Sequence, residues 1–222
     1  MTSNKIEAVA FDMDGLMFNT EDLYDEVGQI LLERRGHQFT RQLKLEMMGL
    51  PVKVAFEIMK RQCNLVEPIE VLQEETYSIF ASMLPDRICT MPGLWELLKA
   101  IESLGLPKCV CTSSRKSFAK QALGMFELEH RFRFVLTSED VDRGKPHPDV
   151  YLLAAKKFRI DPANMLVLED SHNGSMAGAS SGAYTVAVPT THSRELDFSH
   201  AALQVESLQD TRIFDLLSYG RL

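Results

Sequence analysis

Two aspartates, Asp12 and Asp14, directly follow a short apolar run in the stretch VAFDMDGLMFNTE, residues 9–21. In an extended chain, side chains two residues apart leave on the same side. Two like charges held that close shift each other's pKa or share a cation. The spacing therefore predicts a catalytic carboxylate pair or a metal site. The alternative is a polar strand end without chemistry.

Other polar side chains follow later apolar runs in the same way. They are Thr112, Ser113 and Ser114, then Lys145 in the loop RGKPHPD, and Glu169 with Asp170 after MLVL. Taken singly, each has a structural explanation, because hydroxyls and carboxylates favour helix N-termini and Lys145 suits a solvated loop. Taken together, they predict carboxylates, one lysine and a hydroxyl-rich anion site at one edge of a sheet.

That set of groups suits phosphoryl transfer. Carboxylates alone would repel a phosphate, so they require a divalent cation, and oxygen ligands with open positions suit Mg²⁺. Lys145 and the Thr112 hydroxyl would neutralise and orient the remaining phosphate oxygens. One carboxylate can attack phosphorus and form an aspartyl-phosphate, while a second protonates the leaving oxygen and later takes a proton from water.

The elements that must position these residues are short apolar runs separated by helical patterns. The runs cover residues 6–11, 107–111, 133–137, 165–168 and 184–188, with a weaker one at 202–205. Runs that are apolar throughout are typical of parallel strands covered on both faces. The alternation with helices predicts an α/β fold, a Rossmann-like doubly wound parallel sheet, in which ligands bind at the carboxyl ends of the strands.

Residues 20–88 interrupt this alternation, because they contain no strand-like run. One helical pattern there places Leu23, Val27 and Leu31 on a single face, and a second carries a long apolar stripe that begins at Ile69. We therefore predict a catalytic core formed by residues 1–18 and 89–222, with residues 19–88 inserted as an all-helical cap domain.

The composition narrows the range of partners. A net charge of −7 argues against a nucleic acid bound mainly through its phosphates, but not against a small phosphorylated metabolite. The start of the chain, MTSNKIEAVAFDMDG, has no long apolar segment, and no stretch approaches the ~20 apolar residues that span a bilayer. The four cysteines suit reduced core thiols. We expect a cytoplasmic protein without a secretion signal, a membrane anchor or an obligate protein partner.

The motifs FDMDG, CTSS, GKPHPD and LEDS, in this order, resemble the four motifs of the haloacid dehalogenase-like hydrolase superfamily. The helical insert resembles the cap of its β-phosphoglucomutase-like branch. This resemblance implies that Asp12 is the nucleophile and Asp14 the general acid/base. It also implies that Thr112, the Ser113 N–H and Lys145 bind the substrate phosphate.

The same resemblance implies a Mg²⁺ site. Asp170 matches a metal ligand, together with a carboxylate oxygen of Asp12 and the backbone carbonyl of Asp14. Glu169 would bind the metal directly or through water. The implied activity is a Mg²⁺-dependent phosphatase that hydrolyses a small phosphomonoester, such as a sugar or nucleoside phosphate.

The sequence departs from the branch at several positions. Asn19 stands where an aspartate is usual, and we expect it still to cap the next helix. Sugar phosphomutases of the branch carry a cap histidine where this chain has Tyr24, and a cap arginine where it has Val52, followed by Lys53. Because this chain lacks both the cap histidine and the cap arginine, the sequence favours a hydrolase over a mutase. The single tryptophan, Trp95, and the five tyrosines are interpreted as packing residues.

Three other activities remain open as alternatives. The first is a sugar phosphomutase, which would move a phosphate without releasing it. The second is a phosphonate hydrolase, which needs a cap lysine such as Lys44, Lys53 or Lys60 for a Schiff base. The third is a binding protein that holds a phosphate without turnover. A dehalogenase is disfavoured, because those enzymes lack the second aspartate that Asp14 supplies.

Overall fold

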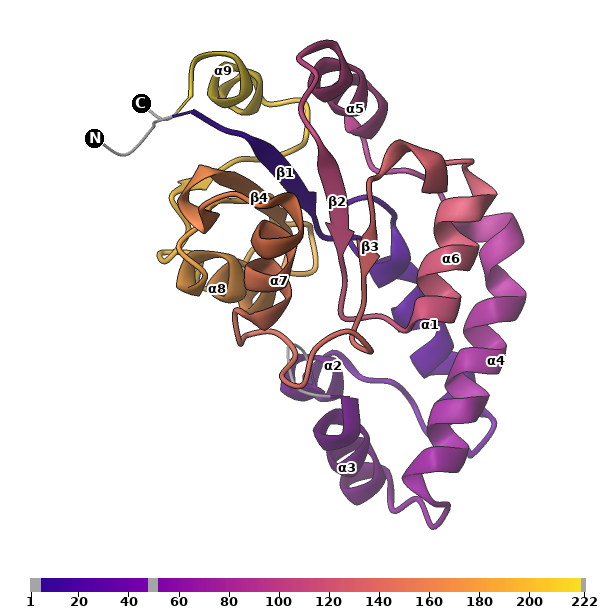
Figure 1. Cartoon of the computed structure of the whole chain (residues 1–222). Coiled ribbons are helices and arrows are strands. Elements are labelled where there is room, and N and C mark those ends of the chain that lie inside the picture. Colours follow the sequence, from indigo (N-terminus) through magenta and orange to yellow (C-terminus); the bar gives the residue numbers. More distant parts are fainter. Residues whose placement is uncertain (1–4, 48–51, 221–222) are drawn as a thin grey trace. The chain divides into compact units, whose positions relative to one another are not determined.

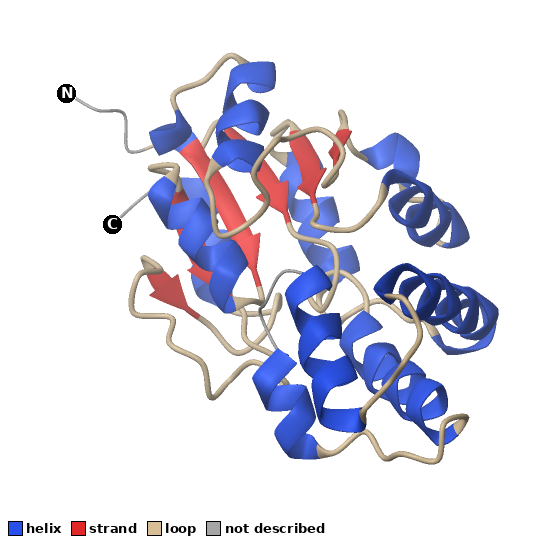
Figure 2. Ribbon diagram, turned by 90° about the horizontal axis from the view of Figure 1, so that it is seen from below, coloured by secondary structure: helices blue, strands red, loops and turns tan. Residues whose placement is uncertain are grey.

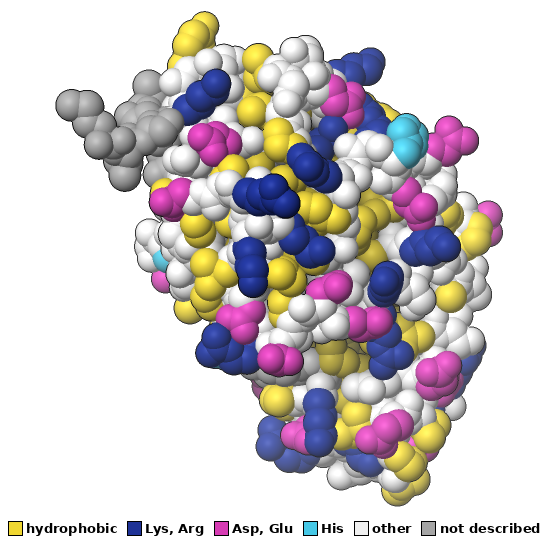
Figure 3. Space-filling view, viewed as in Figure 1, with side chains coloured by type: hydrophobic (Ala, Val, Ile, Leu, Met, Phe, Trp, Pro, Cys, Tyr) yellow, Lys and Arg dark blue, Asp and Glu magenta, His cyan; other side chains and the backbone are white. Residues whose placement is uncertain are grey.

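The structure is a computed structural model that describes residues 5–47 and 52–220. The chain divides into two compact units (Figure 1): residues 1–18 with 90–222, and residues 19–89. We call them the α/β unit and the helical unit. No helix within the described ranges is both long and apolar enough to cross a bilayer. Acidic and basic side chains are both spread over the face shown in Figure 3.

Six strands of the described residues form one sheet in the α/β unit, in the order β3-β2-β1-β4-β5-β6, and every neighbouring pair is parallel. They are β1 (Ala8–Phe11), β2 (Lys108–Cys111), β3 (Val135–Leu136), β4 (Met165–Glu169), β5 (Tyr184–Ala187) and β6 (Leu203–Gln204). Each lies within or overlaps one of the predicted apolar runs. β1, β2 and β4 are buried along their whole length, as expected for strands covered on both faces. The predicted α/β fold is confirmed.

Helices flank this sheet (Figure 2). They are α5 (Leu94–Ser103), α6 (Lys116–Met125), α7 (Asp149–Phe158), α8 (His172–Ser180) and α9 (Thr211–Tyr219), with short 3-10 turns at Glu129–Arg131 and Pro162–Asn164. α7 contacts β1 and β2, α8 contacts β4 and β5, and the two helices contact each other. α5 buries an apolar stripe, of which Leu97, Leu98 and Ile101 are fully enclosed.

Strand order fixes where a ligand can approach the sheet. From β1 the chain moves outward through β2 to β3, and then returns to the other side of β1 for β4, β5 and β6. The direction of winding therefore reverses between β1 and β4. In open α/β sheets the crevice for ligands lies outside the carboxyl ends of the strands at such a reversal.

The helical unit contains α1 (Thr20–Glu33), α2 (Arg41–Met47), α3 (Val52–Cys63) and α4 (Ile69–Arg87). Leu23, Val27 and Leu31 of α1 are buried, and α1 packs against α4. Asn19 occupies the N-cap position of α1 as expected, but its side chain does not make the predicted capping hydrogen bond. Its side chain instead accepts a hydrogen bond from the Cys89 N–H at 2.7 Å. The Asn19 amide therefore joins the first and last residues of the helical unit.

Within the α/β unit, the two segments that flank the inserted helical unit pair with each other. Phe18 and Thr90, the residues at the two ends of the insertion, pair in an antiparallel bridge. Beside them, the Met91 N–H donates to the Met17 carbonyl at 2.8 Å. The chain thus leaves and re-enters the α/β unit at one place.

Candidate active site

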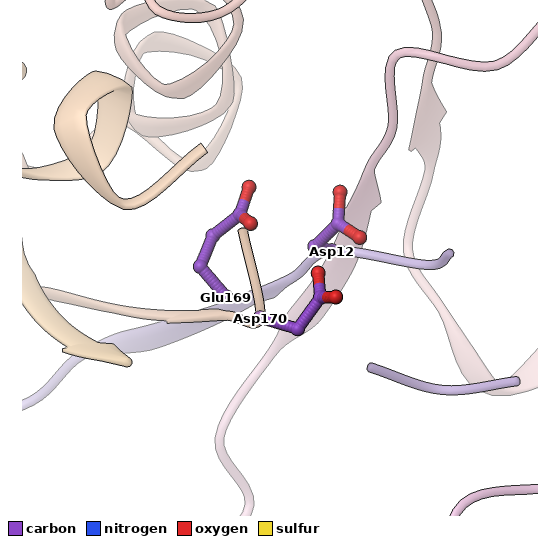
Figure 4. Close-up of side chains that lie close together, drawn as sticks. All are labelled: Asp12, Glu169 and Asp170. Atoms are coloured by element: carbon purple, nitrogen blue, oxygen red, sulfur yellow. The ribbon is translucent and has the colours of Figure 1, made fainter. Parts of the chain in front are cut away.

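The carboxyl ends of β1 and β4 bring three acidic side chains together. Phe11 pairs with Leu168 in the sheet, and the Asp12 N–H donates to the Leu168 carbonyl at 3.0 Å. This register places Asp12 next to the end of β4, where Glu169 and Asp170 lie. Figure 4 shows the three carboxylates gathered there. All three residues are buried, and one oxygen of each lies within 4.8 Å of the others.

Lys145 joins this cluster from the loop before α7. Its ammonium donates to Asp12 Oδ1 at 2.5 Å, to Glu169 Oε1 at 2.6 Å and to the Cys111 carbonyl at 2.9 Å. Only 5% of the Lys145 side chain is exposed. An ammonium has three N–H donors, and these contacts give each of them an acceptor. Lys145 is therefore held in one position by groups from β1, β2 and β4.

Burial and charge act against each other in this cluster. Burial is the main effect that raises the pKa of Asp12, and the negative charge of Glu169 adds to it, whereas Lys145 opposes both. Burial alone would lower the pKa of Lys145, but the carboxylates of Asp12 and Glu169 outweigh it and raise that pKa. Lys145 thus stays a cation, and it neutralises only part of the acidic charge around it.

The residues present fit a divalent cation. If all three carboxyls were ionised, the single ammonium of Lys145 would leave two formal negative charges in a buried site. Burying uncompensated charge is costly unless it is paired or coordinates a metal. Carboxylate oxygens are the donors that Mg²⁺ prefers. The donor set and the charge therefore both suit a hard divalent cation.

Asp14 is held separately from this cluster, by hydroxyl groups. Its Oδ2 accepts from Ser114 Oγ at 2.7 Å and from Thr112 Oγ1 at 3.0 Å. Thr112 Oγ1 in turn accepts from the Ser114 N–H at 3.0 Å. Gly15, with φ of 78°, permits the tight turn that follows Asp14. The two aspartates that are two residues apart in sequence thus have different partners.

The phosphate-binding residues expected from the sequence lie in different surroundings. Thr112 is buried at the end of β2, where its N–H donates to the Leu136 carbonyl at 2.9 Å. Ser113, the next residue, is exposed. The hydroxyl-rich turn therefore lies at the same edge of the sheet as Asp12. Ser113 is exposed to solvent at this edge.

Sequence reasoning gave no individual role to three residues that contact the predicted site. Ser114 donates to Asp14, as described above. Tyr151, on α7, donates from its hydroxyl to Glu169 Oε1 at 2.6 Å. Ser171 donates from its hydroxyl to Glu169 Oε2 at 3.0 Å. Ser114 was named with the hydroxyl-rich run of the CTSS motif, and Ser171 belongs to the LEDS motif, but no spacing in the sequence links Tyr151 to Glu169.

Comparison with known proteins identifies the family. A family model described as haloacid dehalogenase-like hydrolase matches residues 9–188, a span that includes every residue of the site. The chain belongs to the haloacid dehalogenase-like hydrolase family. The resemblance inferred from the four motifs is therefore confirmed.

Relatives of this hydrolase carry phosphatase names. The chain is 30% identical over 207 residues to a bifunctional riboflavin kinase/FMN phosphatase of Arabidopsis thaliana, with 92% of this chain matched, and it spans only 54% of that longer protein. It is also 30% identical over 181 residues to a phosphorylated carbohydrates phosphatase of Thermotoga maritima, covering 80% of this chain and 82% of the relative. Family and names together support classing the chain as a phosphoric monoester hydrolase.

A solved structure supports the branch expected from the sequence. It is a Thermotoga maritima protein with the provisional name beta-phosphoglucomutase. The two chains are 25% identical, with a TM-score of 0.76 over 96% of this chain and 97% of the other. The β-phosphoglucomutase-like branch is thus confirmed by a structural neighbour as well as by the motifs.

Proposed function

We propose that this protein is a Mg²⁺-dependent phosphatase that hydrolyses a small phosphomonoester through an aspartyl-phosphate at Asp12. The observation that carries the proposal is the buried contact of 2.5 Å between Asp12 and Lys145, at the point where the sheet reverses its winding. A carboxylate held beside a fixed cation, with further acidic groups next to it, suits attack on phosphorus within a phosphate dianion.

The two aspartates take different roles in this proposal. Asp12 attacks the phosphorus and releases the alcohol, and the phosphoenzyme is then hydrolysed. Asp14 protonates the leaving oxygen in the first step and takes a proton from water in the second. The separate hydrogen bonds of Asp14 to Thr112 and Ser114 support this division, because its carboxyl group does not share Lys145 with Asp12.

The phosphate group of the substrate would be bound by the Thr112 hydroxyl, the Ser113 N–H and Lys145. Asp12, Asp170 and the Asp14 carbonyl would hold the Mg²⁺, with Glu169 as a direct or water-mediated ligand. When bound, the cation would offset the repulsion between the carboxylates and the incoming phosphate. Lys145 supplies the remaining positive charge and keeps Asp12 oriented.

The substrate is a small phosphorylated metabolite, of the sugar phosphate or nucleoside phosphate class. The phosphorylated carbohydrates phosphatase and the FMN phosphatase among the relatives support these classes. A sugar phosphomutase is the second candidate. It is favoured by the similarity to the Thermotoga maritima structure that carries the name beta-phosphoglucomutase. The expected location, the cytoplasm, and the role of the helical unit as a cap are likewise proposals.

Phosphate release from a panel of phosphomonoesters tests this function. The panel is assayed with Mg²⁺, after removal of divalent cations with EDTA, and after Mg²⁺ is added back. The native protein should release phosphate only with Mg²⁺, and Asp12→Asn should lower kcat by roughly a thousandfold or more, because it removes the nucleophile. Asp142→Asn makes the same chemical change at an exposed residue and should leave kcat unchanged.

Three results would contradict the proposal. Release that survives in Asp12→Asn would show that Asp12 is not the nucleophile. Release that is indifferent to EDTA would exclude the metal. Conversion of one sugar phosphate isomer into another without free phosphate, detected by chromatography, would identify a mutase.

A further inference from the structure

A buried tyrosine hydroxyl on α7 donates a hydrogen bond to the proposed catalytic cluster. Tyr151 is fully buried on α7, and its hydroxyl donates to Glu169 Oε1 at 2.6 Å. A phenol can fill a core position as phenylalanine does, but its hydroxyl must then find an acceptor. Here the acceptor is a carboxylate at the end of β4 that is itself fully buried.

The oxygen that accepts from Tyr151 also accepts from Lys145. The Lys145 ammonium lies 2.6 Å from the same Glu169 Oε1, and 5.2 Å from the centre of the Tyr151 ring. The Lys145 ammonium therefore lies over the face of the Tyr151 ring, and the Tyr151 hydroxyl shares an acceptor with it. The other oxygen of Glu169 accepts from the Ser171 hydroxyl at 3.0 Å.

We infer that Tyr151 is a positioning residue that holds Lys145 on Asp12 by fixing the carboxylate of Glu169. The inference rests on the proposed function, since Lys145 matters to the rate only if Asp12 attacks phosphorus. A glutamate side chain has three torsions, and hydrogen bonds to both of its oxygens restrict it to fewer rotamers. With Tyr151 bonded, Glu169 presents Oε1 to Lys145 at a fixed place, and Lys145 is aligned in turn.

This role differs from that of a residue that only stabilises the core. Loss of the hydroxyl leaves the Lys145 charge close to the phosphate, so that binding of the ester in the ground state is largely retained. The alignment of Lys145 is what suffers, and alignment is felt chiefly in the transition state. The inference therefore predicts a loss in kcat with a much smaller change in KM. A core defect would lower stability and leave both constants of the folded enzyme unchanged.

The test is steady-state kinetics of Tyr151→Phe on the best ester of the panel, at several Mg²⁺ concentrations. Phenylalanine keeps the ring and removes only the oxygen, and kcat should fall about tenfold, the size expected for one hydrogen bond to a charged group. The Mg²⁺ concentration for half-maximal rate should not change. Tyr184→Phe, at the amino end of β5 and away from the site, is the matched control and should retain the native kcat.

A second pair of variants covers the case in which the space left by the oxygen prevents folding. 4-Methylphenylalanine at position 151 fills that space without a donor, and it should lose kcat as Tyr151→Phe does. 4-Aminophenylalanine restores a donor, and it should recover most of the native kcat. Thermal unfolding of each variant verifies that the folded protein is compared.

Each other outcome overturns the inference in a recognisable way. A native kcat in Tyr151→Phe would mean that the hydroxyl does not act on the chemistry, and the proposed phosphatase would stand. A higher Mg²⁺ requirement that accounts for the whole loss would mean that Tyr151 acts on the metal and not on Lys145. If the native protein itself releases no phosphate, the proposed function fails, and the inference fails with it.

Discussion

At the scale of single residues, the buried carboxylate of Glu169 depends on a glycine. Gly174 lies in the first turn of α8, and its N–H donates to the hydroxyl of the N-cap residue Ser171 at 3.1 Å. A Cβ at position 174 would lie 1.9–2.1 Å from the carboxylate atoms of Glu169. The absence of a side chain here is therefore what makes room for Glu169 beside Lys145.

Gly174→Ala should consequently destabilise the protein, although alanine is the better helix former. We expect a loss of about 1–3 kcal/mol in the free energy of unfolding, because Glu169 must be displaced from its hydrogen bonds. Phosphatase activity should fall as well. Urea unfolding monitored by circular dichroism measures the first effect.

Gly124→Ala in α6 is the matched control for this substitution. The nearest atom to a Cβ there is Glu129 Oε1, at an ordinary contact distance of 3.8 Å. It should be neutral or stabilising by about 0.5–1 kcal/mol, the usual gain of alanine over glycine in a helix. Equal effects of the two substitutions would refute the steric role of Gly174.

Most residues of the site could be predicted, because parallel strands end at one edge. Asp12, Thr112 and Glu169 each follow an apolar run, and the structure brings them to the same edge of the sheet. The role of Tyr151 could not be predicted, since the residue occupies a buried helical position and was interpreted as a packing residue. Its hydrogen bond arises only when α7 lies over β1 and β2, and that placement is a matter of tertiary structure.

At the scale of whole elements, the strands were predictable and their order was not. Each strand is short, apolar and flanked by turn residues, so its existence follows from local sequence. The order β3-β2-β1-β4-β5-β6 depends instead on which helix crosses which face of the sheet. The side-chain bond of the N-cap residue Asn19 was mispredicted for a related reason, because its side chain accepts from Cys89, far along the chain.

An ion cluster joins α5 to the amino end of β2, whereas the site lies at the carboxyl ends of the strands. Glu102, near the C-terminus of α5, accepts from Arg131 at 2.6 and 2.8 Å and from Lys108, the first residue of β2, at 2.7 Å. The guanidinium of Arg131 also lies 5.5 Å from the centre of the Trp95 ring. A carboxylate at a helix C-terminus is unfavourable by itself, and these two cations offset it.

This cluster makes a prediction about acid stability. Arg131 first, and then Lys108, lower the pKa of Glu102 from 4.5 to about 2. A carboxyl whose pKa is lowered by folding stabilises the native state above its unfolded pKa, and this contribution is lost as the pH falls through the folded pKa. Glu102→Gln should therefore reduce the free energy of unfolding at neutral pH. The difference from the native protein should shrink as the pH falls below 4.5.

Urea unfolding at a series of pH values measures this difference. We expect it to be about 1 kcal/mol near neutral pH, because the Glu102 side chain is 39% exposed and water screens its ion pairs. Glu96→Gln, at an exposed position of α5, is the control. A difference that stays constant into the acid range would show that the cluster does not act through the charge of Glu102.

At the scale of the molecule, a divalent cation should stabilise the native state. The carboxylate cluster is assembled from β1 and β4, so it exists only in the folded chain. Mg²⁺ at about a hundredfold excess over its Kd should add about 2.7 kcal/mol to the free energy of unfolding. Differential scanning calorimetry with and without Mg²⁺ should show the thermal transition moving upward.

Two variants decide whether that shift comes from the proposed site. Asp170→Asn removes one of the clustered carboxylates and should abolish most of the Mg²⁺-dependent shift. Asp142→Asn, at an exposed loop position, should retain all of it. A shift of equal size in both variants would place the cation elsewhere in the protein.

On the ribosome, β1 emerges well before the strands that flank it, because β2 begins at Lys108 and β4 at Met165. The intervening helical unit is continuous in sequence and can complete its own fold during translation. Until then β1 is an apolar segment whose two edges have no partner strand. Such unpaired edges can pair with other chains and lead to aggregation. The bridge between Phe18 and Thr90 brings the chain back beside β1 once the helical unit is finished. Nascent chains arrested between residues 90 and 165 should therefore bind chaperones more strongly than the finished protein.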